Sequence, residues 1–260
     1  MAKVIAIANQ KGGVGKTTTS VNLSASLAAT ERKLLLIDID PQGNATMGSG
    51  VDKNQLHVSS YDVLMGGETI VDASMWVDKC QYQLLPGNGD LTGAEVALLE
   101  EIGRELKLKV ALSYVKECYD YVIVDCPPSL NMLTLNALVA ADAVMIPMQC
   151  EYYALEGLTA LLETIEKVRT VLNPQLHIEG LIRTMFDPRN NLANQVSAQL
   201  VKYFGDKVYS TIVPRNIRLA EAPSHGLPVI AYDKKSSGAL AYLALAGELL
   251  RRDEVALQVE

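Results

Sequence analysis

The chain has 260 residues, of which 49% are hydrophobic and 20% charged, and its formal net charge at pH 7 is −7. This balance excludes a largely disordered chain, and the length is sufficient to bury a sizeable core. The acidic total argues against a nucleic-acid partner, because phosphate binding needs a concentrated positive surface.

Short apolar segments alternate with longer amphipathic segments along the whole chain. We expect strands at residues 3–8, 33–38, 83–86, 121–125, 143–147, 178–184 and 210–213. Several are apolar on both faces, which is typical of parallel strands covered on both sides. We expect helices at residues 16–30, 94–117, 130–140, 155–172, 192–204 and 239–251, and short helices and loops over one sheet edge at residues 43–77. This order predicts one doubly wound α/β domain over residues 1–260, with a mostly parallel sheet and helices on both faces.

The four cysteines form no C-x-x-C pair and have no histidine at zinc-ligand spacing; they are Cys80, Cys118, Cys126 and Cys150. Neither a disulfide framework nor a metal site is therefore indicated, and buried thiols are expected. The apolar run that follows Lys3 is too short for a signal peptide, and no segment has the 18 or so apolar residues that a membrane helix requires.

A glycine-rich segment, Asn9–Thr18, lies between the first expected strand and the first expected helix. Its glycines at positions 12, 13 and 15 permit positive φ angles and close backbone approach, so that successive N–H groups can face phosphate oxygens. Lys16 would contact the β- and γ-phosphates, and Thr17 would ligate Mg²⁺. The usual phosphate-loop pattern has glycine where this chain has Gln10. The order of strand, loop, Lys-Thr pair and helix nevertheless predicts a nucleotide site.

Carboxylates follow two further strands beside this loop. Asp125 ends the strand at residues 121–125, where it can hold the hydration shell of Mg²⁺. Asp38 and Asp40 lie at the end of the second expected strand, and either could orient an attacking water. Alternation along a strand would put these two on one face.

These motifs resemble those of the ParA/Soj family of chromosome and plasmid partition ATPases, within the deviant Walker A class of P-loop NTPases that also includes MinD. Three segments are typical of the wider class, namely Lys11–Thr18, Asp38–Asn44 and Asp125–Ser129. The partition branch is indicated by Gln149–Gly157 and by Val213–Asn216 with Glu221–Ser224.

The resemblance implies an Mg²⁺-dependent ATPase with its functional residues at matching positions of this chain. Lys11 would reach across an ATP-sandwich dimer to the partner's nucleotide, Asp40 would orient the water, and Gly12 would lie where the subunits approach closely. The implied catalytic residues are Lys11, Lys16 and Asp40. The implied metal residues are Thr17, Asp40 and Asp125. The implied nucleotide-binding residues are Lys11, Gly12, Gly13, Val14, Gly15, Lys16, Thr17 and Thr18, with Pro214 and Asn216 against the adenine.

The resemblance also implies the partners and the location. ATP-bound homodimers would bind double-stranded DNA without sequence preference, and a ParB-type centromere-binding protein would release them by stimulating slow hydrolysis. The protein would be cytoplasmic and associated with the nucleoid. Because the first strand is expected to begin at Lys3, an N-terminal operator-binding extension is not expected.

Residues 183–235 differ in charge from the rest of the chain. They contain eight basic and four acidic residues, a net charge of +4, whereas the remainder has 15 basic and 26 acidic residues, a net charge of −11. This segment could form a surface that contacts phosphates, or it could be a solvated edge whose charges point in several directions. The family resemblance favours the first interpretation and places DNA contacts at Arg189 and Arg218.

Two other classes of function remain as alternatives. A MinD-like membrane-associated ATPase would need a basic amphipathic C-terminal helix, but Arg251 and Arg252 are followed by Asp253, Glu254 and Glu260. Membrane binding is therefore not expected. A small-molecule kinase or ligase would use the same loop but would need a pocket for a metabolite.

Overall fold

A computed structural model describes residues 2–152 and 154–257, so Tyr153 of the Gln149–Gly157 motif lies outside the described residues. Its centre is an eight-stranded sheet with the order β3-β4-β2-β5-β1-β6-β7-β8, in which β3 is antiparallel to β4 and the other neighbours are parallel. The strands are β1 (Lys3–Ile7), β2 (Leu34–Asp38), β3 (Met75–Val77), β4 (Tyr82–Leu85), β5 (Tyr121–Asp125), β6 (Ala143–Gln149), β7 (His177–Phe186) and β8 (Val208–Pro214). The expected fold class and all seven expected strands are confirmed.

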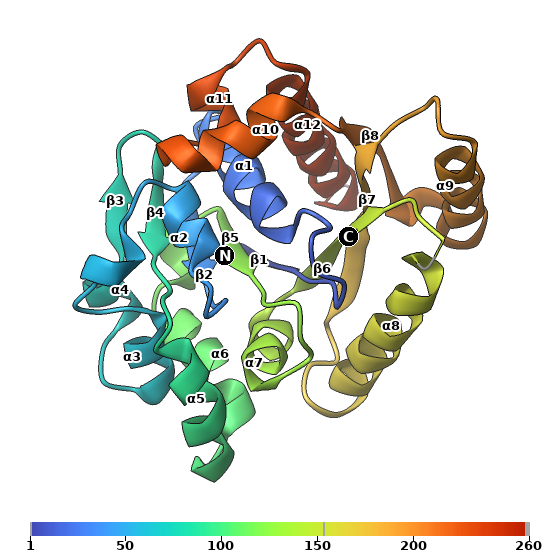
Figure 1. Ribbon diagram of the computed structural model, residues 1–260. Coiled ribbons are helices and arrows are strands. Elements are labelled where there is room, and N and C mark those ends of the chain that lie inside the picture. The colour runs from blue at the N-terminus through green and yellow to red at the C-terminus, as the bar shows by residue number, and fades with distance from the viewer. Residues whose placement is uncertain (1, 153, 258–260) are drawn as a thin grey trace.

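Helices cover both faces of the sheet (Figure 1). One face packs against α1 (Lys16–Ala28), α2 (Asn44–Gly48), α10 (Ile217–Glu221), α11 (Val229–Tyr232) and α12 (Ser237–Leu257). The other face packs against α3 (Ser60–Met65), α4 (Ile70–Ala73), α5 (Leu91–Ala97), α6 (Lys107–Ser113), α7 (Met132–Ala140), α8 (Ala154–Val171) and α9 (Asn191–Phe204). The core therefore consists of two apolar layers separated by the sheet.

The central strand β1 is apolar at every position from Val4 to Ile7, because both of its faces are covered. Val4 and Ala6 belong to the layer under α3 to α9, whereas Ile5 and Ile7 belong to the layer under α1 and α12. All four side chains are buried. Successive residues of a strand point to opposite faces, so a strand covered on both faces needs apolar residues at each position.

Two local expectations were wrong. The single helix expected at residues 94–117 is divided into α5, α6 and short 3₁₀ turns, and the chain changes direction at Gly103, where φ is +65°. Such a backbone angle suits glycine and ends a helix. Strand β3 was not expected; it is a three-residue edge strand within the segment where only short helices and loops were foreseen.

The edge strand β8 is covered by side chains. β8 bulges between the pairs Leu181–Val208 and Arg183–Ile212, because β7 advances two positions there while β8 advances four. Arg183 donates to the carbonyls of Tyr209 and Ser210, and Glu248 of α12 accepts the N–H groups of Ser210 and Thr211. These bonds satisfy backbone groups that an open edge would offer to another chain.

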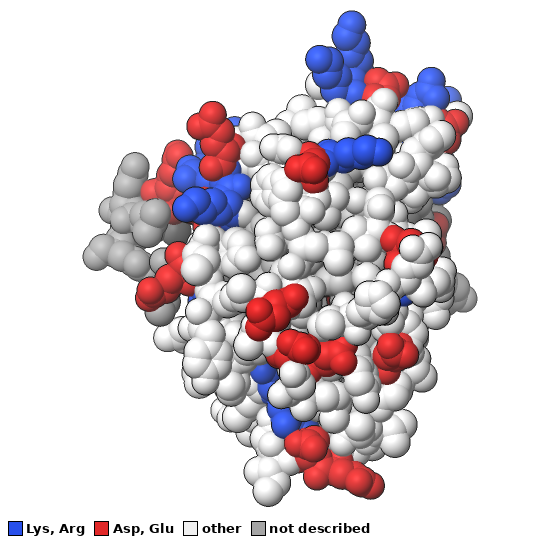
Figure 2. Space-filling model, turned by 90° about the vertical axis from the view of Figure 1, so that its left-hand side faces the viewer, with Lys and Arg blue, Asp and Glu red and all other residues white. Residues whose placement is uncertain are grey.

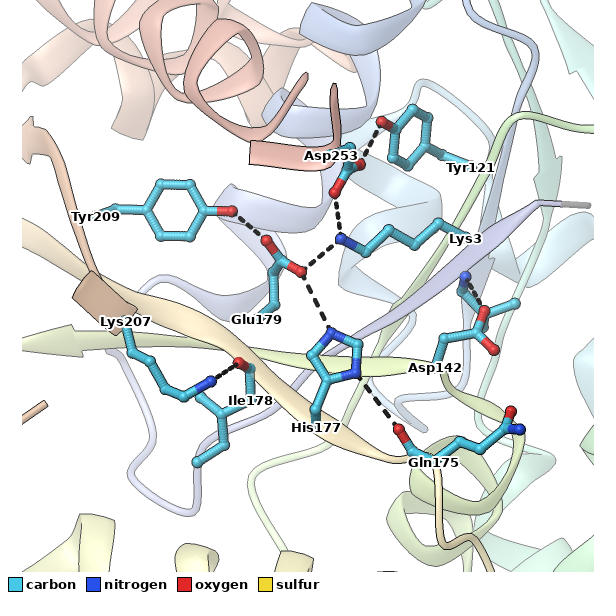
Figure 3. A network of polar contacts seen from close by, with 11 residues as sticks. Lys3, Tyr121, Asp142, Gln175, His177, Ile178, Glu179, Lys207, Tyr209 and Asp253 are labelled. Carbon is cyan, nitrogen blue, oxygen red and sulfur yellow. Dashed lines mark hydrogen bonds and ion pairs between the residues drawn. The ribbon is translucent and has the colours of Figure 1, made fainter. Parts of the chain in front are cut away.

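At the amino ends of the strands, a cluster of polar side chains connects the first strand to the last helix (Figure 3). The Lys3 ammonium lies 2.6 Å from Glu179 Oε2 and 2.5 Å from Asp253 Oδ1. The hydroxyl of Tyr209 donates to Glu179, and that of Tyr121 donates to Asp253, both at 2.7 Å. Residues separated by 250 positions are thus joined directly.

This cluster determines how Glu179 titrates. Burial alone would raise the pKa of Glu179, but Lys3 and the Tyr209 hydroxyl outweigh burial, so the pKa lies below its ordinary value. A carboxylate with a depressed pKa stabilises the fold above its ordinary pKa, and that contribution is lost as the pH falls through the depressed value.

We expect Lys3→Met to lower the free energy of unfolding by about 3 kcal/mol at pH 7, because it leaves the buried Glu179 carboxylate without its cation. Urea denaturation measures this loss, and the difference from the parent should shrink below about pH 4, where carboxylates take up protons. Lys109→Met, at an exposed position of α6, is the control and should change the free energy by less than about 0.5 kcal/mol. Equal effects of the two substitutions would contradict the role of the cluster.

Candidate functional site

The loop Asn9–Gly15 connects the carboxyl end of β1 to the first residue of α1. Gly13 and Gly15 have φ values of +73° and +88°, as the sequence predicted for them. Gly12 does not have a positive φ, so that part of the expectation was wrong. A side chain at Gly12 would meet no described atom within 4 Å, so the described chain itself gives no reason for glycine there.

The loop is held in place by two side chains, Asn9 and Thr184, for which the sequence predicted no role. The Asn9 amide donates to the carbonyl of Pro147 on β6, and its oxygen accepts the N–H of Lys11. The Thr184 hydroxyl on β7 donates to the carbonyl of Val14 at 2.7 Å. Asn9 could have been suspected from its place in the loop, but Thr184 could not, since 170 residues separate it from Val14.

The two lysines of the loop have different surroundings. Lys16 is buried, with 7% of its surface exposed, and its ammonium donates to the carbonyl of Lys11 at 3.2 Å. Burial lowers the pKa of Lys16, although Asp125 and Asp40 act in the opposite direction. The Lys11 ammonium lies 2.6 Å from Glu151 Oε2 at the surface.

Asp125 joins the sheet to the first turn of α1. One of its oxygens accepts the Thr17 hydroxyl at 2.8 Å, and the other accepts the Ser20 hydroxyl at 2.7 Å. The structure thus brings together Thr17 and Asp125, as the sequence predicted. Ser20 was missed, although residues three apart on a helix share a face and its position after Thr17 could have revealed it.

Asp38 and Asp40 separate into two environments. Asp38 is fully buried and accepts the N–H and the hydroxyl of Thr46, together with the N–H of Asp40. Asp40 lies beyond the end of β2, and its Oδ1 accepts the N–H of Gln42 in the following turn. Asp38 is therefore committed to holding the loop after β2, which leaves Asp40 as the carboxylate better suited to act on a water.

Burial raises the pKa of both inner carboxylates, Asp125 and Asp38. Burial raises the pKa of Asp125, the charge of Asp38 adds to this effect, and the hydrogen bonds from Ser20 and Thr17 oppose it. Burial likewise raises the pKa of Asp38 against the bonds from Thr46. A divalent cation beside Thr17 and Asp125 would reverse this balance, because it stabilises the ionised carboxylate.

The oxygen donors present suit Mg²⁺. No group of three or more His, Cys, Asp or Glu side chains within the described ranges could enclose a metal ion by itself. Mg²⁺ usually takes only one or two protein ligands and completes its shell with water and phosphate oxygens. The Thr17 hydroxyl and the Asp125 carboxylate therefore fit a cation that arrives together with a phosphate ligand.

A small pocket of about 170 Å³ opens beside the loop. Its lining includes Gly15 and Thr18 from the loop and its helix, together with Pro214 at the end of β8 and Asn216 just after it. Asn216 also begins α10 by accepting the N–H of Leu219. The two residues assigned to the adenine by resemblance thus lie next to the phosphate loop, although they follow it by about 200 positions in the sequence.

The basic segment, residues 183–235, has fewer basic side chains free to contact phosphates than its net charge suggested. Arg183, one of its eight basic residues, is buried at the β8 bulge, so it cannot belong to a contact surface. Arg189 is exposed and pairs with Asp187 through two nitrogens. Arg218 is also exposed and pairs with Glu221 and Asp233. A phosphate would have to replace these carboxylates.

Comparisons with known proteins agree with this geometry. A family model described as an AAA domain matches residues 2–178. The sporulation initiation inhibitor protein Soj of Bacillus subtilis is 54% identical over 96% of this chain and 98% of its own length. The chromosome partitioning protein ParA of Caulobacter vibrioides is 51% identical over 96% of this chain and 95% of its own length.

Among solved structures, a cobyrinic acid a,c-diamide synthase from Mycobacterium smegmatis, with bound ADP and magnesium, superimposes with a TM-score of 0.86. It is 40% identical and covers 98% of this chain and 96% of its own. The named function of this structural relative differs from those of the two sequence relatives.

We expect Asp125→Asn to raise the free energy of unfolding in the absence of nucleotide and divalent cations. Because the pKa of Asp125 is raised in the folded state, ionisation of this group costs stability as the pH rises above about 4, and the substitution removes that cost. Urea denaturation at pH 5, 6.5 and 8 should give a difference of about 1 kcal/mol or more that widens with pH. A flat difference for Asp125→Asn would contradict the raised pKa.

Proposed function

This chain belongs to the ParA/Soj family of partition ATPases, and from that premise we propose that it binds and slowly hydrolyses ATP with Mg²⁺ to switch a DNA-bound dimer. The observation that carries the proposal is the convergence of Lys16, Thr17 and Asp125 behind a glycine loop. A ParB-type partner would stimulate hydrolysis and release the dimer during chromosome or plasmid segregation.

The nucleotide would lie between the loop and the segment after β8. Backbone N–H groups of the loop and the amino end of α1 would bind its phosphates, and Lys16 would donate to the terminal phosphates. Pro214 and Asn216 would contact the adenine. Thr17 and Asp125 would hold Mg²⁺, which would supply positive charge to the phosphate oxygens.

Hydrolysis would need Asp40 and a second copy of the chain. Asp40 would accept a hydrogen bond from the attacking water, and Lys11 of one protomer would donate to the nucleotide of the other. To reach the other protomer's nucleotide, Lys11 would have to leave Glu151. This costs little, since both side chains are more than one-third exposed. Such surface pairs contribute at most about 1 kcal/mol. A close approach of two loops at Gly12 would account for glycine at a position that the described chain leaves open.

DNA binding would follow dimerisation. Arg189 and Arg218 would contact backbone phosphates, and a dimer would present two copies of each. In the monomer both arginines are neutralised by neighbouring carboxylates. Contact with DNA would therefore be weak for one protomer and substantial for two, which supports a switch that depends on the dimer.

The observations favour this function over a MinD-like membrane-associated ATPase. At the end of α12, Arg252 pairs with Glu248 and Asp253 pairs with Lys3, so these charges belong to the fold and do not form a free basic helix for a membrane. Within the described part of the chain, no helix has the length and apolarity to cross a bilayer. We propose a cytoplasmic, nucleoid-associated protein. The other alternative, a small-molecule kinase or ligase, would be revealed by ATP turnover that depends on a metabolite substrate.

We expect Lys16→Ala to weaken ATP binding by about 100-fold or more, because it removes charge-assisted hydrogen bonds worth up to about 3 kcal/mol each. Isothermal titration calorimetry with a non-hydrolysable ATP analogue and Mg²⁺ measures this change. Lys109→Ala serves as the matched control and should bind as the parent does. Retained affinity in Lys16→Ala would refute the phosphate-binding role of the loop.

The experiment that tests the whole proposal is DNA binding measured with ATP, ADP and no nucleotide over a salt series. We expect binding with ATP alone, falling steeply with salt. If Arg189→Ala with Arg218→Ala removes four phosphate contacts per dimer, the slope of log K against log salt should decrease by about 3.6.

Arg169→Ala is a matched control for this series, since Arg169 forms the same kind of exposed pair three residues apart on α8 that Arg218 forms on α10. It should leave the slope unchanged. Nucleotide-independent binding would contradict the switch, and an unchanged slope in the double variant would remove these two arginines from the DNA surface.

A further inference from the structure

A second concave site lies on the face of the sheet that carries α3 to α9. It is a groove of about 600 Å³ between α3, α4 and α6, and it shares no lining residue with the phosphate loop. Val63, Ile70 and Val115 belong to its lining and are buried. Exposed apolar side chains also line it, namely Val71, Ile102, Leu106, Val110 and Tyr114.

The segment around α6 is apolar on two sides. Leu108, Leu112 and Val115 are buried in the core beneath it. Leu106, Val110 and Tyr114, each four positions from the next, line the groove and are exposed. A surface helix needs one apolar stripe to pack on its core, and residues four apart share a face. The second stripe therefore has no function within the described fold.

The exposed side chains are large and contiguous with the groove. Ile102 is 98% exposed, Tyr114 is 82% exposed and Val71 is 65% exposed. Single exposed apolar residues are common, but a cluster around a concavity marks a docking surface on a soluble protein. A groove with apolar anchors at helical spacing suits the apolar face of an incoming helix.

The polar rim determines the chemistry of the occupant. Lys107 pairs with Glu101 at 2.7 Å, and Arg104 lies beside Glu105, so these charges cancel. Glu68 lines the groove and is exposed. Among the other charged residues of the chain segments that form its lining, residues 66–72 and 99–115, Asp72 and Glu100 are exposed acids and Lys109 is an exposed base. Figure 2 looks onto this side of the molecule, and acidic side chains predominate in its lower half. The rim thus favours a basic partner.

We propose that this groove binds an amphipathic helix of a partner protein, with apolar residues on one face and lysine or arginine on its flanks. The same rim disfavours two other occupants. A second copy of the chain would bring two acidic rims together, and a bilayer of anionic lipids would be repelled. The site requires no nucleotide, so its occupation is independent of the ATPase reaction.

The test uses a fluorescent 18-residue helical peptide made of leucine and lysine, with leucine at positions i, i+3, i+4 and i+7. Fluorescence anisotropy with the full chain should show saturable binding that weakens with salt. A peptide with glutamate in place of lysine should bind at least tenfold more weakly. Equal binding of the two peptides would overturn the proposal.

Substitutions locate the binding site of the peptide. Val110→Ser and Tyr114→Ser should each raise its Kd at least fivefold, whereas Leu240→Ser, at a 56% exposed position of α12, should change it less than twofold. Glu68→Lys should raise the Kd at low salt, and Glu163→Lys on α8 should not. A loss of peptide affinity in the control variants, or no loss in the groove variants, would refute the assignment of the peptide to this groove.

Two further measurements distinguish the other occupants. Sedimentation of the chain alone should give the same mass for the parent and for Val110→Ser. A change of oligomeric state would identify a second copy as the occupant. Vesicles of phosphatidylglycerol should not bind the parent through this groove, and binding that Val110→Ser abolishes would identify a lipid surface. Either result would overturn the proposal of a helical partner.

Discussion

The buried carboxylate of Asp125 is the constraint around which the site is arranged. It lies at the end of a central strand and accepts hydroxyl hydrogen bonds from both Thr17 and Ser20 on α1. These bonds fix the start of the helix against the sheet and therefore fix the loop that precedes it. The same carboxylate is fully buried beside Asp38, so its charge is costly in the absence of a cation. Binding of Mg²⁺ at Asp125, as we propose, would therefore also relieve this repulsion.

The sequence predicted the elements that depend on local patterns. Continuous apolar runs reveal inner parallel strands, and the order of strand, glycine loop and helix reveals the phosphate site, because each pattern reflects neighbours along the chain. The break in the expected helix at Gly103 was missed, because a glycine inside an amphipathic run can either lie within a helix or end it. Thr184, which holds the loop at Val14, was invisible for a different reason: its role depends on the order of strands β1, β6 and β7 in space.

Charge could be counted from the sequence, but not located. The basic segment contains Arg183, whose guanidinium instead satisfies carbonyl groups at the bulge of the edge strand. Arg189 and Arg218 are exposed, yet each is paired with carboxylates of its own segment. If these two arginines contact DNA, as we propose, their field at a distance would be small and they would act only where a phosphate replaces a carboxylate at contact. Such a surface suits attachment that must be reversible better than attraction from far away.

The cluster around Lys3 also has a consequence for how the chain acquires its structure during synthesis. β1 is a central strand and is made long before α12, so its Lys3 ammonium can meet Asp253 only after 250 further residues have been synthesised. The apolar layer under α1 is completed by α12 at the same late moment. Until then, the central strands and the loop they carry lack part of their cover. A nascent chain therefore exposes part of its apolar core until α12 has been synthesised, and such exposed surface is prone to aggregation.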